Sequence, residues 1–313
     1  MTLNFSWNDS ALKVASDTSW RARYRALQSW YRETELRVPP GQDAAGRPLG
    51  SLLPEAEVQA RPGLNFLTPE IADYVERRTA EVRESGGTIE VDRLRRNMLS
   101  SMPLCFNLFG HLRGVPAVAA SVFSQLLKLD IARIDLIEVE WAPPREEHLE
   151  DRTAFDALVR YRSGDGQKGF LGIETKYTEP FSRTVYERER YRELTECADS
   201  GFKPGAFEKL LGAKTNQLWR NVLLTQSLKR TEGVSGHCVV VACQDDAGAQ
   251  AALSGLRAEL REPNEVLRFL PLENLVAAFA AQPETARWAE SFRRRYLDLP
   301  PSGGELRASA RRD

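Results

Sequence analysis

A change in hydrophobic period near residue 132 most constrains the fold of this 313-residue chain. Before it, apolar residues recur at the spacing of helices. After it, three segments have the composition and alternation of strands, at 132–141, 155–163 and 168–178. The Gly-Asp-Gly sequence at 164–166 predicts a hairpin turn between the second and the third. These segments therefore predict an antiparallel start to a sheet.

The rest of the chain supplies helices and a further strand. The unbroken apolar run at 237–243 is typical of a buried central strand. This order of elements predicts an α/β fold, with a mixed central sheet flanked by helices on both faces. We expect helices at 10–36, 68–84, 101–129 with a break near 113–116, 183–198, 214–230, 246–261 and 272–296, and a short strand at 266–271.

Composition limits the class of protein. We expect a mostly helical N-terminal extension over 1–98, an α/β core over 99–298 and a disordered tail over 299–313, which is rich in Pro, Gly, Ser and Arg. We find no apolar run of membrane-spanning length and no secretory signal, and the four cysteines are scattered. We therefore expect a cytoplasmic protein without a membrane partner. The net charge of −1 predicts no general affinity for nucleic acid, so such a partner would need a local patch.

An acid and a lysine stand two residues apart where the third predicted strand ends. Glu174 and Lys176 share one face of that strand, because side chains two apart point the same way. The hairpin returns the preceding strand beside it, which brings Asp156 to the same face. Two adjacent carboxylates repel unless a proton or a cation lies between them. Mg²⁺ or Mn²⁺ between them would grip a phosphate oxygen and activate water, with the lysine beside it.

This arrangement resembles the PD-(D/E)XK nuclease superfamily, with the motif standing as Asp156 and then Glu174-Thr175-Lys176. The segments NMLSSMPLCFNLFG (97–110), TAFDALVRY (153–161), GFLGIETKYTE (169–179) and NQLWRN (216–221) are similar to a bacterial PD-(D/E)XK nuclease-like family of about this length. The resemblance implies a restriction-endonuclease-like core of α-β-β-β-α-β order and metal-dependent hydrolysis of phosphodiester bonds. It covers about residues 20–280.

The chain departs from the superfamily pattern in two places. Phe155 stands where the motif has Pro, and residues 101–129 contain no acid, although many members carry a metal-binding Glu on the first core helix. Glu138 or Glu140 on the first predicted strand could replace that ligand, and Glu140 lies nearer the strand's end, where open sheets place their sites. A solvated strand face is the alternative.

Further site residues are expected on the helix that follows the hairpin. Gln217, Arg220 and Asn221 share a face at helical spacing. The resemblance implies a catalytic role for Gln217, and we expect Arg220 and Asn221 to contact nucleic acid. A polar surface stripe is the alternative. Asp151 could also replace Asp156 as the motif's aspartate, although it precedes the strand.

Three functions stay open at this stage. The favoured one is a Mg²⁺- or Mn²⁺-dependent nuclease acting on DNA, with RNA left open, in a role such as bacterial restriction or phage defence. The second is a non-cleaving nucleic-acid-binding or regulatory module that keeps the nuclease fold. The third is hydrolysis or ligation of another phosphate substrate. The N-terminal region could clamp substrate or mediate a homodimer.

Overall fold

A five-stranded mixed sheet forms the centre of the protein, as seen in a computed structural model that describes residues 14–212 and 214–299. The spatial order of its strands is β3-β4-β5-β6-β7. The strand segments expected from the hydrophobic pattern are confirmed to within a few residues. They are β3 Arg133–Trp141, β4 Phe155–Arg162, β5 Lys168–Thr175, β6 Ser235–Ala242 and β7 Leu267–Pro271.

The sheet changes from antiparallel to parallel pairing at β5. β3, β4 and β5 pair antiparallel in chain order, and β5, β6 and β7 pair parallel. The hairpin between β4 and β5 turns over 163–167, where Gly166 has a φ of +84° that favours glycine. The parallel pairing of β5 and β6 requires a crossover, and helix α9 provides it.

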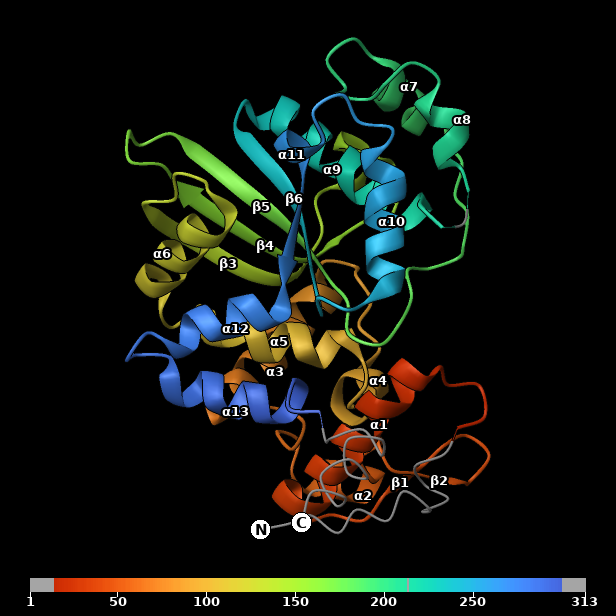
Figure 1. The fold of residues 1–313 in the computed structure, drawn as a ribbon, viewed down its shortest axis with the longest axis vertical. Helices are drawn as coiled ribbons and strands as arrows, with labels where there is room; N and C mark the ends of the chain where they lie inside the picture. Colours follow the sequence, from red (N-terminus) through yellow and green to blue (C-terminus); the bar gives the residue numbers. More distant parts are fainter. Residues whose placement is uncertain (1–13, 213, 300–313) are drawn as a thin grey trace, which may run out of the picture.

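Helices cover both faces of the sheet (Figure 1). On one face, α5, α6 and α12 pack against side chains such as Val139 and Ile173, within one hydrophobic cluster. On the other face, α9 and α10 pack against Leu158 and Val240, within a second cluster. The alternation of these side chains along each strand is the physical basis of the two clusters. The mixed α/β fold with a flanked central sheet is therefore confirmed.

Most helical predictions are confirmed in type and to within a few residues, but the expected 10–36 helix begins only at Ser19 and the expected 183–198 helix only at Glu189. The expected break near 113–116 separates α5 from α6, since Pro116 starts a new helix. The helices are α1 Ser19–Tyr31, α2 Glu55–Ala60, α3 Pro69–Glu84, α4 Val91–Arg96, α5 Ser101–Leu112, α6 Pro116–Leu127, α7 Glu189–Glu196, α8 Ala206–Leu210, α9 Asn216–Glu232, α10 Ala247–Arg257, α11 Pro263–Val266, α12 Leu272–Ala280 and α13 Ala286–Tyr296, with a π-helical turn at Arg32–Leu36 and a 3₁₀ turn at Arg145–Glu147.

The N-terminal region packs closely onto the rest of the chain. α1 and α3 contribute to the same hydrophobic cluster as α5 and α13, and β1 Gly41–Gln42 pairs with β2 Pro48–Leu49 beside them. The buried side chain of Gln28 on α1 donates hydrogen bonds to the Tyr177 hydroxyl and the Arg295 carbonyl. The division at residue 98 stays a prediction. The first residues of the expected 10–36 helix and almost all of the expected disordered tail lie outside the described residues.

The expected helix over 183–198 is wrong in its first half. The helix there, α7, begins only at Glu189, and the residues before it run without regular structure. The reason is tertiary, because two backbone amides, one just before this stretch and one within it, are bonded to side chains of α9. Ser182 N donates to Gln217 Oε1 at 2.6 Å, and Tyr186 N donates to Asn216 Oδ1 at 3.1 Å.

A search for membrane-spanning helices within the described ranges found none long and apolar enough to cross a bilayer.

Candidate active site

Three carboxylates lie in register across the first three strands of the sheet. Glu140 of β3 stands opposite Asp156 of β4, between the paired positions of Val139 and Trp141. The antiparallel register of β4 and β5, continued by one residue, places Asp156 opposite Glu174. The row points to the α9 face, because Ala157 and Ile173, their neighbours along the strands, face the other cluster. The expected convergence of Asp156 and Glu174 on one face follows from this register.

Three donors surround the Glu174 carboxylate. Lys176 Nζ lies 2.6 Å from Oε1, the Gln217 side-chain amide donates to Oε1 at 2.7 Å, and the Asn221 side-chain amide donates to Oε2 at 2.6 Å. Glu174 is only 2% exposed, so these charge-assisted bonds replace its lost hydration. The carboxylate is therefore held in one orientation by both β5 and α9.

Asp156 is held by the residue that follows Glu174. Its Oδ2 accepts hydrogen bonds from Thr175 N at 2.7 Å and from Thr175 Oγ1 at 2.8 Å. Burial and the charge of Glu174 raise the pKa of Asp156 to about 7, although Lys176 and Thr175 act in the opposite direction. A carboxyl pKa raised this far means that burial and the neighbouring negative charge disfavour the ionised form of Asp156.

Glu140 completes the row in an uncommon backbone conformation. Its φ is +54°, in the left-handed region that a strand residue other than Gly rarely occupies. Burial, followed by the charges of Asp156 and Glu174, raises the pKa of Glu140 to about 8. Arg78 of α3 fixes this strand end, donating to the Val139 carbonyl at 2.7 Å and the Glu140 carbonyl at 3.0 Å.

Contacts of Arg78 also distinguish Glu138 from Glu140, the two acids that could serve as the third metal ligand. Arg78 Nη2 lies 2.6 Å from Glu138 Oε1, so that carboxylate is already paired. Glu140, by contrast, is coupled through its charge to Asp156 and Glu174. The geometry therefore places Glu140 in the acidic row and Glu138 beside it.

Lys176 is the positive charge of the site. It is 7% exposed, and its ammonium group lies 4.7 Å from the centre of the Phe181 ring. Burial alone would lower its pKa, but the attraction of Glu174 and Asp156 outweighs burial and raises the pKa of Lys176. Lys176 is therefore a charged ammonium group enclosed between carboxylates and an aromatic ring.

Helix α9 presents its polar face to the row, while Leu218 and Val222 are buried in the core. Gln217 lies where the sequence places it, on the helix that flanks Lys176. Asn221 is 3% exposed and bonded to Glu174, beneath the carboxylate rather than at the surface. Its expected contact with nucleic acid stays a prediction.

Arg220 lies on the rim beside the row and is held by two side chains. It donates to Thr153 Oγ1 at 2.9 Å and pairs with Asp151 at 3.5 Å. Asp151 also accepts from Thr153 N and from the Tyr191 hydroxyl. It thus organises the loop before β4, whereas Asp156 lies in register with Glu174.

A family model described as the PD-(D/E)XK nuclease superfamily matches residues 15–298. The chain belongs to this superfamily. Its five-stranded mixed sheet with flanking helices is a restriction-endonuclease-like fold, as the resemblance implied. Searches of curated proteins and of solved structures gave no match.

The donor set fits the divalent cation that PD-(D/E)XK nucleases generally use. Three carboxylates lie in one row, and two of them have pKa values raised by burial and mutual repulsion, a strain that a hard cation relieves. As they stand, no group of three or more His, Cys, Asp or Glu side chains in residues 14–212 and 214–299 is arranged around a common ion position. The Lys176 ammonium group and the amides of α9 occupy the oxygens of Glu174 instead.

Two features of this superfamily site were missed by sequence reasoning. Arg78 lies 61 residues before Val139, and no local pattern connects α3 to the end of β3. The alternation of side chains along β5 predicts that Thr175 faces away from Glu174, yet its hydroxyl reaches Asp156 because β5 ends there. The only sequence signal for Thr175 is its position between the motif residues Glu174 and Lys176.

Proposed function

We propose that the protein is a divalent-metal-dependent nuclease that hydrolyses phosphodiester bonds in DNA. The observation that carries this proposal is the row of Glu140, Asp156 and Glu174, of which Glu174 is buried and the other two are half-buried, beside the charged Lys176. The three carboxylates would hold the ion, Mg²⁺ or Mn²⁺, which when bound supplies Lewis-acid activation of water and phosphate. The assignment to DNA rests on the superfamily resemblance.

The protein's own groups have separate tasks in this proposal. Gln217 and Asn221 orient Glu174, and Thr175 orients Asp156. Lys176 stabilises negative charge that develops on the phosphate and positions the attacking water. Glu140 replaces the acid that the first core helix lacks. Arg220, with its guanidinium fixed on the rim, contacts a phosphate of the substrate.

A cavity beside the row supports a phosphate-bearing substrate. It has a volume of about 520 Å³, and Glu140, the end of α3 and the loop between β3 and β4 line it. Arg145 and Arg152 also line it, and both are exposed. Within the described ranges, neither arginine side chain has a hydrogen bond or ion pair, so both are free to bind phosphate oxygens.

The test is incubation of the purified protein with plasmid, linear duplex DNA, single-stranded DNA and RNA, each with Mg²⁺, Mn²⁺ or EDTA. We expect cleavage of DNA with either metal ion and none with EDTA. Glu174→Gln and Asp156→Asn should abolish it, whereas Glu284→Gln, at an exposed position outside the site, should cut like the wild type. Cleavage that persists in EDTA or in Glu174→Gln would refute the proposed chemistry. Binding of DNA without cleavage would favour the non-cleaving module.

A further inference from the structure

Two consecutive apolar side chains stand exposed beside the site. Among the described residues, Val185 at 48% and Tyr186 at 43% are the large hydrophobic side chains that are exposed. The other large apolar residues of this region, such as Phe181 and Tyr191, are buried in the cluster around α9. This exposed valine-tyrosine pair is therefore the candidate apolar contact surface of the loop.

The loop that carries this pair is fixed to the site. Asn216, which is fully buried, bonds both the Tyr186 amide, at 3.1 Å, and the Tyr186 carbonyl, at 3.0 Å. Gln217, the next residue of α9, accepts from Ser182 N at 2.6 Å and donates to Glu174 at 2.7 Å. One helix end thus holds both the exposed loop and a carboxylate of the acidic row.

The Tyr186 ring is supported from below. The guanidinium carbon of Arg220 lies 4.5 Å from the ring centre, and Arg220 is itself bonded to Thr153 and Asp151. A ring that rests on a fixed guanidinium and is still 43% exposed is prepared to stack against a flat ligand. Little ordering entropy remains to be lost when such a ligand binds.

Positive charge flanks the pair on the same loop. Arg183 and Arg188 are exposed, and in the part of the chain that the structure describes neither guanidinium has a hydrogen bond or ion pair. Arg183 also lines a cavity of about 520 Å³ with Phe181 and Lys214. Unpaired arginines before and after an exposed aromatic residue on one loop are the residue types with which proteins bind phosphates and stack bases.

We propose that Val185 and Tyr186 form a stacking platform for an unpaired nucleobase of the substrate, with Arg183 and Arg188 contacting the adjacent phosphates. This inference rests on the proposed function for its choice of ligand. A duplex hides the faces of its bases, so the platform takes a single strand or an opened end. Through Asn216 and Gln217, a base on the platform sets the register of the strand against Glu174.

Fluorescence anisotropy in EDTA, where no cleavage is expected, tests the platform. The probes are a short single-stranded DNA, the same strand with abasic sites, and the matching duplex. Tyr186→Ser should weaken binding of the intact single strand by about 5- to 150-fold, the range for loss of one aromatic stacking partner. It should leave binding of the abasic strand nearly unchanged. Tyr186→Phe keeps the ring and should bind like the wild type, and melting curves should match because the side chain is exposed.

Several outcomes would overturn the platform. These are equal loss by Tyr186→Ser on intact and abasic strands, unchanged affinity in Tyr186→Ser, or no binding of any strand by the wild type. Unchanged affinity would indicate that the pair contacts another macromolecule. If the wild type cleaves DNA but Tyr186→Ser binds normally, the platform fails while the proposed function stands. If nothing is cleaved but base-dependent binding is lost in Tyr186→Ser, the proposed function fails and the platform stands.

Discussion

Replacing Lys176 with methionine tests whether its positive charge offsets the negative charges of the acidic row, Glu140, Asp156 and Glu174. Lys176 is 7% exposed, its ammonium group lies 2.6 Å from the Glu174 carboxylate, and its charge also attracts Asp156. Removing one partner of a buried ion pair typically costs about 3–5 kcal/mol, because the other charge stays buried without compensation. For a chain of 313 residues, the average unfolding entropy per residue converts this loss into about 5–8 °C of melting temperature.

The measurement is thermal unfolding of wild type and Lys176→Met at about pH 8, in EDTA and over a Mg²⁺ titration. In EDTA the variant should melt about 5–8 °C lower. Mg²⁺ should raise the melting temperature of both proteins, and more for the variant, because the cation replaces the missing positive charge. The variant should remain inactive at every Mg²⁺ concentration, since the ion restores charge balance but not the lysine.

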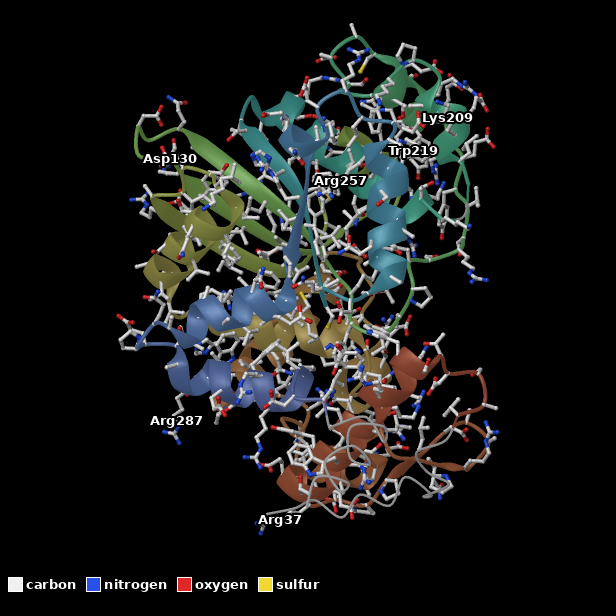
Figure 2. The ribbon with its side chains drawn as sticks, in the orientation of Figure 1. Arg37, Asp130, Lys209, Trp219, Arg257 and Arg287 are labelled. Atoms are coloured by element: carbon white, nitrogen blue, oxygen red, sulfur yellow. The ribbon has the colours of Figure 1, made fainter. Side chains whose placement is uncertain are left out.

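Lys209→Met is the matched control. Lys209 on α8 forms an ion pair with Glu259 at 3.0 Å, but its side chain is 61% exposed (Figure 2). Its loss should cost about 1 kcal/mol or less and should not change the response to Mg²⁺. Equal melting temperatures of Lys176→Met and wild type in EDTA would refute the role of Lys176 in compensating the carboxylates. Equal increases in melting temperature with Mg²⁺ would refute it as well.

Other predictions concern the rest of the site. In Glu174→Gln, the stabilisation by Mg²⁺ should largely disappear together with cleavage; a wild-type Mg²⁺ shift in calorimetry would contradict its role as a ligand. Without metal, the folded-state pKa values of Asp156 and Glu140, about 7 and about 8, exceed their unfolded values. The stability they contribute is fully present below the unfolded pKa values and is lost progressively as pH rises from about 4 to about 8. The melting temperature in EDTA should therefore fall over that range more steeply for wild type than for Asp156→Asn; parallel curves would argue against it. Arg78→Met leaves Glu138 unpaired and two carbonyls without donors, so urea unfolding should show a loss of about 3 kcal/mol or more. Cleavage should fall as well, and unchanged activity would show that the end of β3 needs no such support.

The sheet and the three charged motif residues could be placed from local pattern. A strand's period of two fixes that Glu174 and Lys176 share a face, and the Gly-Asp-Gly turn fixes that β4 and β5 are antiparallel neighbours. Those two rules are enough to put Asp156 on the same face as Glu174. The amphipathic pattern likewise predicted α9 and the face that carries Gln217.

The remaining features depend on segments that are far apart in the chain. Nothing near Glu140 predicts its left-handed backbone, which Arg78 supports from 62 residues away. The charged stretch from 183 has a helical composition, but its Tyr186 amide bonds to Asn216 and the preceding Ser182 amide bonds to Gln217, and those tertiary bonds prevail over weak helix propensity. Local sequence determines which face a side chain takes, because that choice is made by the nearest backbone atoms. The partner it meets there, such as Asn221 for Glu174 across 47 residues, is decided only when the packed core brings the two elements together.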